Sequence, residues 1–125
     1  MKRYYQPKGD KKGKYALREN VYRRTWYLIA DYPYYKRTHG KEGGGTVVRE
    51  TEFGYRIQGP PLQYLKYIEA IEAAKKEIPE QYIDDIMSHI MEKKRYKDIE
   101  GVSEKTLKKW VQKFIWHVAH NLGDV

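Results

Sequence analysis

The last quarter of the chain, from Gly101 to Gly123, carries the clearest helix signal. Ser103 is a favoured N-cap, because its hydroxyl can accept a hydrogen bond from an otherwise unpaired first-turn N–H. Gly123 stands where a helix commonly ends in a left-handed residue. Apolar residues recur between them every three or four positions, which predicts one helix with one buried stripe. The stripe comprises Leu107, Trp110, Val111, Phe114, Ile115, Val118, Ala119 and Leu122.

The opposite face of this predicted helix is basic and polar. Its lysines fall largely in the first two turns, where the helix dipole disfavours positive charge. Cations placed there stabilise the helix little, so they favour an anion outside the fold, and phosphate is the strongest candidate. The residues predicted to contact it are Lys105, Thr106, Lys108, Lys109, Gln112 and Lys113.

The composition agrees with an anionic partner. The net charge is +8 and 34% of the residues are charged, which favours nucleic acid, although ordinary solubility is the alternative interpretation. No apolar run approaches the roughly 20 residues of a membrane span, so we expect no membrane partner. The absence of cysteine excludes disulfides and thiolate metal sites and fits a reducing cytosol without requiring one.

Two segments are expected to be mobile. Residues 1–14 form a basic arm broken by glycine and proline, and this arm is predicted to add nonspecific DNA affinity. Residues 39–60 form a glycine-rich loop in which Thr46–Val48 and Tyr55–Ile57 are candidates for a short β-hairpin. The cations assigned to the arm are Lys2, Arg3, Lys11, Lys12 and Lys14.

The rest, residues 15–125, is predicted to be a single helical domain. The fold class is all-α: a small helical bundle that ends in a helix-turn-helix-like pair. Apolar spacing predicts four helices, with proline disfavouring helix at the residue before it and favouring the first turn after it. They are expected from Ala16 to Asp31, from Pro61 to Ile78, from Glu80 to Lys93 and from Ser103 onward, with a single turn at Tyr96–Ile99 before the last.

The turn before the last helix is the sharpest local motif. Gly101 permits a tight turn, Val102 can fill the gap between two crossing helices, and Ser103 caps the next helix. This is the arrangement of a helix-turn-helix, in which the second helix enters the DNA major groove. A plain corner between two packed helices is the alternative.

Several segments together resemble the RinA/ArpU-type late-gene transcriptional regulators of phages and prophages. The resemblance implies a DNA-binding regulator of late genes that acts in the cytoplasm of a bacterial host. It also implies that the C-terminal half is similar to the last DNA-binding region of sigma factors. The chain departs from that pattern at Tyr96–Ile99, where about one helical turn is missing. The segments are Tyr22, Asp31–Arg37, Tyr67–Glu72, Ile78–Tyr82, Val102–Trp110 and Ala119–Gly123.

An enzyme is not expected. His117 and His120 are three residues apart, but no acidic residue stands beside them at a metal-ligand spacing. The carboxylates Glu80, Asp84 and Asp85 are explained by the start of a helix, where negative charge is favourable. We therefore expect no catalytic residues, no metal and no cofactor.

Aromatic residues are numerous, with 13 tyrosines and three tryptophans. Trp116 lies just off the apolar stripe and is a candidate self-association contact, which makes a homo-oligomer an open expectation. The aromatic residues predicted to lie outside the core are Tyr4, Tyr5, Tyr15, Tyr34, Tyr35 and Trp116.

The leading prediction is thus a phage-type regulator that binds double-stranded DNA. Two alternatives stay open: a DNA-recognition subunit of a phage packaging machine, similar to a small terminase, and an adaptor that binds RNA polymerase or its sigma factor. A ring of subunits would favour packaging, and a lack of duplex binding would favour the adaptor.

Overall fold

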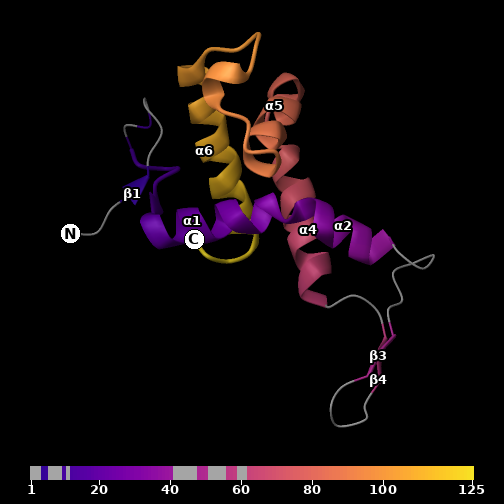
Figure 1. Cartoon of the computed structure of the whole chain (residues 1–125). Helices are drawn as coiled ribbons and strands as arrows, with labels where there is room; N and C mark the ends of the chain where they lie inside the picture. Colours follow the sequence, from indigo (N-terminus) through magenta and orange to yellow (C-terminus); the bar gives the residue numbers. More distant parts are fainter. Residues whose placement is uncertain (1–3, 6–9, 11, 41–47, 51–55, 59–61) are drawn as a thin grey trace.

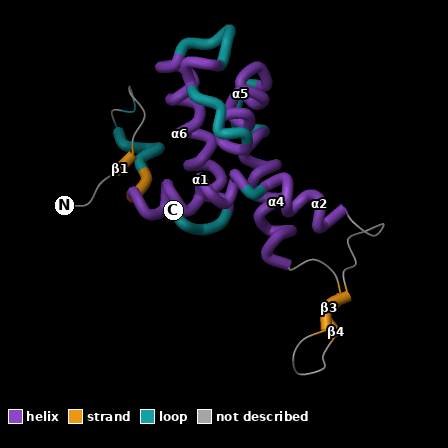
Figure 2. Tube along the Cα trace, viewed as in Figure 1, coloured by secondary structure: helices purple, strands orange, loops and turns teal. Residues whose placement is uncertain are grey.

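The fold is seen in a computed structural model that describes residues 4–5, 10, 12–40, 48–50, 56–58 and 62–125. Most of the described chain is helical, as predicted for an all-α protein (Figure 2). α6 (Glu104–Asn121) packs against α1 (Glu19–Ala30), α4 (Leu62–Lys75) and α5 (Glu80–Met91). The last helix of the chain therefore joins three of the earlier helices (Figure 1).

The predicted ends of α6 are confirmed. Ser103 Oγ accepts from the Thr106 N–H at 3.2 Å, as an N-cap should. Gly123 has a φ of +84°, and the Asp124 N–H donates to Ala119 O at 2.9 Å. This pair of features is the Schellman termination, in which a left-handed glycine satisfies the last carbonyls.

The first predicted helix is α1, which begins at Glu19, three residues after the predicted Ala16, and ends at Ala30. A further helix that was not predicted, α2 (Tyr32–Gly40), begins after Asp31, so the predicted loop of residues 39–60 was wrong for residues 39–40. Pro33 lies in the first turn of α2, where the missing N–H costs no helical hydrogen bond. Asp31 O accepts from the Tyr34 and Tyr35 N–H groups at 2.9 and 3.2 Å, which starts the new helix.

The second half follows the predicted order. α4 and α5 lie in the two predicted spans, although α4 ends at Lys75, three residues before the predicted Ile78, and α5 ends two residues before the predicted Lys93. A single 3-10 turn, η1 (Tyr96–Asp98), stands where one turn was predicted. Gly101 has a φ of +84°, the left-handed conformation for which glycine is favoured. The chain thus reverses between α5 and α6 in a short connection.

Two pairs of short strands accompany the helices. β3 (Val48–Glu50) and β4 (Arg56–Gln58) pair antiparallel within the glycine-rich loop. β1 (Tyr4–Tyr5) pairs antiparallel with β2 (Leu17–Arg18), with Tyr5 opposite Leu17. The arm was predicted to be unstructured over residues 1–14, and this was wrong for Tyr4–Tyr5, which is part of a sheet.

One hydrophobic core joins the helices. Tyr35 was predicted to lie outside this core, but its side chain is only 6% exposed, and the prediction was wrong. It is buried because α2 continues as a helix and packs against α4. The side chains with 1% exposure or less that fill the core are Leu17, Ile29, Ile71, Ala74, Ile86, Ile90, Leu107, Val111, Phe114, Ile115, Val118 and Ala119.

Candidate nucleic-acid interface

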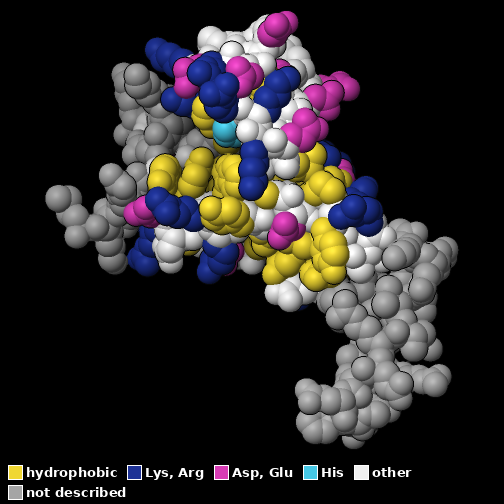
Figure 3. Space-filling view, in the orientation of Figure 1, with side chains coloured by type: hydrophobic (Ala, Val, Ile, Leu, Met, Phe, Trp, Pro, Cys, Tyr) yellow, Lys and Arg dark blue, Asp and Glu magenta, His cyan; other side chains and the backbone are white. Residues whose placement is uncertain are grey.

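Three lysines of α6 follow one another along its exposed side. Lys105, Lys109 and Lys113 are spaced four residues apart, so they share one helix face. Lys105 and Lys109 are exposed and Lys113 is half-buried. Figure 3 shows Lys and Arg side chains at the end of the molecule where η1 and the start of α6 lie, with acidic side chains beside them on the α5 side.

Lys113 is held between two aromatic rings. Its Nζ lies 5.0 Å from the centre of the Tyr15 ring and 4.8 Å from the centre of the Trp110 ring. Burial lowers the pKa of Lys113, Lys109 and Lys14 lower it further, and Asp10 opposes them. Lys109 and Lys14 are therefore close enough for their charges to act on Lys113. We call Lys14, Lys105, Lys109 and Lys113 the basic face.

A tight turn brings Lys14 to this face. Asp10 closes the turn, because its two carboxylate oxygens accept from the Lys14 and Tyr15 N–H groups at 2.9 and 2.8 Å. Gly13 has a φ of +68°, and its N–H donates to Asp10 O at 3.1 Å. The sequence holds a signal for this turn, since Asp at the first position and Gly at the fourth favour a type I turn. Sequence reasoning missed it.

Thr106 and Lys108 are less available than the predicted interface required. Lys108 Nζ lies 3.1 Å from Glu104 Oε1, in an exposed pair four residues apart. The Thr106 hydroxyl accepts from Ser103 Oγ at 2.8 Å, so it is part of the helix cap. Both side chains lie at the start of α6 as predicted, but each has a partner within the protein.

Gln112 was predicted to face DNA, and this was wrong. Its side chain is 6% exposed, and Nε2 donates to Tyr5 O at 2.9 Å and to Tyr15 O at 3.1 Å. The physical reason is that the N-terminal segment covers this edge of α6, which the helix pattern alone leaves open. Gln112 therefore fastens the beginning of the chain to its last helix.

The predicted arm cations divide into two groups. Lys2, Arg3 and Lys11 lie outside the described residues. Lys12 and Lys14 are both exposed on the turn that precedes β2. Only the second group is thus placed beside α6, through Lys14.

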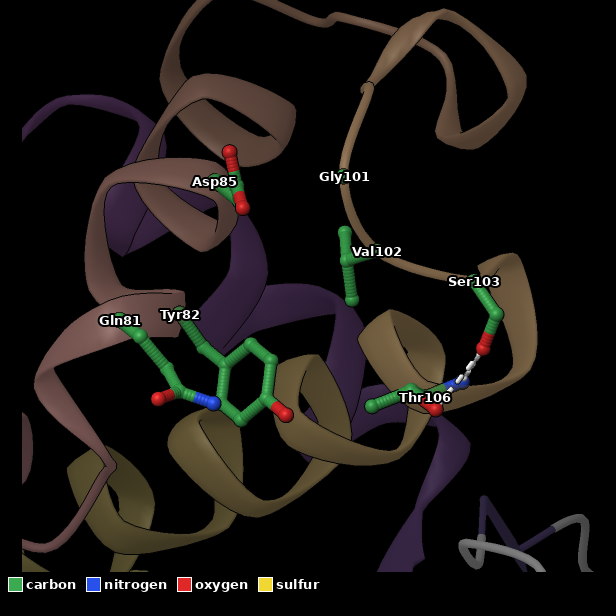
Figure 4. A pocket seen from close by; sticks show the side chains of 7 residues that line it. All are labelled: Gln81, Tyr82, Asp85, Gly101, Val102, Ser103 and Thr106. Atoms are coloured by element: carbon green, nitrogen blue, oxygen red, sulfur yellow. Dashed lines mark hydrogen bonds between the residues drawn. The ribbon is translucent and has the colours of Figure 1, made fainter.

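A small hollow lies where the turn meets α5 (Figure 4). It has a volume of about 320 Å³, and Gln81, Tyr82 and Asp85 face the turn and the start of α6 across it. The Tyr82 ring stacks on Trp110, with ring centres 5.6 Å apart. Val102 points toward this hollow, as expected for a residue between two helices. The hollow adjoins the basic face through Trp110, and Asp85 gives its wall a negative charge.

The histidines of α6 belong to an aromatic cluster. Trp116 stacks on His120 at 4.8 Å between ring centres and meets the Tyr15 ring edge-on at 5.3 Å. Burial lowers the pKa of His117. Trp116 is half-buried by these neighbours, so part of the surface proposed for self-association is already covered by Tyr15.

Among the residues that the structure describes, no group of three or more histidines and carboxylates is arranged to hold a metal ion. No helix of the described chain is both long enough and apolar enough to span a membrane.

No protein-family model matches the chain, and neither the curated proteins nor the solved structures contain a significantly similar protein. The resemblance to the RinA/ArpU-type regulators therefore stays a prediction.

Proposed function

We propose that the protein binds double-stranded DNA through the basic face. Lys105 and Lys109 would contact phosphates directly, and Lys14 would extend the contact beyond the helix. Arginine and lysine contacts to phosphate position a protein on the duplex without selecting a sequence. The proposed lysine contacts therefore provide affinity for any duplex and do not by themselves recognise bases.

The observation that carries this proposal is incomplete neutralisation, because Asp10 acts on Lys113 but forms no described salt bridge with it. Among the described residues, none of the four lysines of the basic face forms a salt bridge with a carboxylate. Neighbouring ammonium groups repel one another, and a phosphate placed between them relieves this repulsion. Release of condensed counterions from DNA adds to the gain in free energy.

The connection between α5 and α6 supports a helix-turn-helix-like mode of binding. α6 would approach the major groove with its first two turns, while α5 and η1 hold its start in place. In this arrangement the exposed Gln81 of α5 lies across the hollow from the start of α6 and is the candidate for a contact with a base edge. A role in late-gene regulation would follow from the predicted resemblance to the RinA/ArpU-type regulators.

The test is duplex binding measured across salt concentrations. The change is Lys105→Glu together with Lys109→Glu, which reverses two charges on exposed positions of one face. Loss of two phosphate contacts should weaken binding to every duplex and reduce the slope of log K against log salt by about 2. Circular dichroism and a thermal melt establish that the variant is folded.

A matched control has the same change in net charge at the other end of the molecule. Arg37 on α2 and Lys66 on α4 are exposed and form no described salt bridge. Arg37→Glu with Lys66→Glu should keep the wild-type salt slope, with only a modest general loss of affinity. Equal losses in the two variants would mean that net charge alone drives binding, and the proposed interface would be wrong.

A further inference from the structure

The beginning of the chain is fixed to α6 by one buried amide. Gln112 Nε2 donates to the carbonyl oxygens of Tyr5 and Tyr15, at 2.9 and 3.1 Å, and so holds both sides of the N-terminal loop. A buried amide with satisfied hydrogen-bonding groups is costly to disturb, because the carbonyls it serves lose their donor. One side chain thus joins both Tyr5 and Tyr15 to α6.

Other contacts make the same segment rigid near the basic face. The Tyr5 ring stacks on Tyr22 with centres 4.2 Å apart, and Leu17, which pairs with Tyr5, is 1% exposed. The Tyr15 ring meets Trp116 and covers Lys113. The loop is therefore attached to α6 by its backbone at Gln112 and by the Tyr15 side chain.

The attached turn carries cations. Lys12 and Lys14 are exposed on it, and Asp10 fixes its backbone through the Lys14 and Tyr15 N–H groups. Lys14 lies close enough to Lys113 to lower the pKa of that lysine. Asp10, on the same turn, attracts Lys113 and offsets this repulsion, and the two hydrogen bonds of Gln112 add a second attachment of the segment to α6.

We infer that Gln112 is a positioning residue for duplex binding, which holds the Lys12–Lys14 turn against α6 so that both present their cations to the same phosphate backbone. This inference rests on the proposed function. It also replaces two predictions from the sequence: Gln112 acts through the turn instead of touching DNA, and the turn is a fixed part of the interface instead of a free arm. A preorganised set of charges binds more tightly than a mobile one, since less conformational freedom is lost on binding.

The test uses the full chain and Gln112→Met. Methionine has a similar length and fills the same space, but it cannot donate to the two carbonyls. The salt slope for duplex binding should fall by about 2, the share expected of Lys12 and Lys14. The comparison variant, Lys12→Ala with Lys14→Ala, should lower the slope equally. A combination of all three changes should lower it no further, because both remove the same contacts.

Two readouts separate positioning from simple stability. Amide hydrogen exchange in Gln112→Met should rise at Tyr5 and at residues 15–18 and stay unchanged in α5. A lowered thermal midpoint with a wild-type salt slope would overturn the positioning role, as would unchanged exchange at Tyr5 and residues 15–18. Should wild-type protein bind no duplex while exchange rises as expected, the proposed function fails and Gln112 remains only a structural fastener.

Discussion

Lysines and tyrosines meet in two places in this protein, with opposite electrostatic outcomes. At the corner between α2 and α4, Lys36 and Lys75 Nζ lie 3.8 and 3.7 Å from Glu72 Oε1, and Tyr32 OH donates to the same carboxylate. On the basic face, Lys113 Nζ also lies over aromatic rings, but its described neighbours include two further lysines. Similar residue types thus share a carboxylate through salt bridges in one place, whereas in the other Asp10 acts on Lys113 without a described salt bridge.

The difference teaches how to distinguish structural cations from binding cations. Each lysine at the corner interacts with a carboxylate and a ring of the protein itself, so its charge is used within the fold. The lysines of the basic face contact rings, which supply only a weak attraction in exposed positions. Their remaining electrostatic potential is available to an external anion.

The largest expected loss of stability comes from a core residue of α6, the helix that carries most of the basic face. Phe114 is 1% exposed on the inner side of α6, so Phe114→Ala leaves a cavity and should reduce the free energy of unfolding by about 3–5 kcal/mol. Urea unfolding followed by circular dichroism measures this loss. If stability were unchanged, α6 would be oriented differently, and the comparison between the two clusters would lose its basis.

A smaller loss is expected where the carboxylate serves the fold. Glu72→Gln keeps an acceptor for Tyr32 but removes the attraction for Lys36 and Lys75. Because the Glu72 side chain is 42% exposed, the free energy of unfolding should fall by only about 1 kcal/mol, and less at high salt. Urea midpoints at low and high salt measure it.

The control for that variant is Glu69→Gln on the same helix. Glu69 is exposed and forms no described salt bridge, so its replacement should leave stability within about 0.5 kcal/mol of wild type. Equal losses in the two variants would show that the corner is not a specific cluster.

Much of the fold could be predicted from local signals. The hydroxyl of Ser103 and the glycine at Gly123 define both ends of α6 by chemistry that acts within a few residues. The structure around Pro33 was harder to predict, because a proline disfavours helix at the residue before it and favours the first turn of a helix after it. The sequence alone does not show that a new helix follows immediately.

The part of the site that could not be predicted depends on distant partners. Gln112 lies at the border between the buried and exposed sides of α6, so the helical period leaves its surroundings undefined. Its partners, Tyr5 and Tyr15, are 107 and 97 residues away along the chain. No local pattern specifies such a contact. The lysines, by contrast, lie away from the apolar stripe as predicted, with Lys105 and Lys109 exposed and Lys113 half-buried.

The lowered pKa of His117, a half-buried side chain of α6, should make the stability of the fold sensitive to acid. Burial lowers the pKa of His117, Glu77 opposes the shift, and His120, Lys14 and Lys113 add to it. The folded protein therefore binds this proton less readily than the unfolded chain, whose histidine pKa is about 6.5. Stability from this source is fully present above about pH 6.5 and is lost as the pH falls toward the lower folded value.

His117→Gln should flatten the fall in thermal midpoint between about pH 7 and pH 5, while the exposed His120→Gln should preserve more of it. Thermal melts at intervals of half a pH unit compare the variants with wild type. A fall that is just as steep in His117→Gln would assign the acid sensitivity to other groups.

The smallest expected change in stability is that of replacing a salt-bridged pair on α6, and it can be compared with the replacement of an unpaired lysine on the same helix. Lys108 Nζ lies 3.1 Å from Glu104 Oε1, and both side chains are more than half exposed. Replacing both residues by alanine removes no net charge and should change the free energy of unfolding by about 0.5 kcal/mol or less.

Because the pair is neutralised, the double variant should also keep the wild-type salt slope for duplex binding. Lys109→Ala, in contrast, should reduce that slope by about 1. If the paired substitution reduced the slope as much as Lys109→Ala does, neutralisation within the fold would not distinguish structural from binding lysines here.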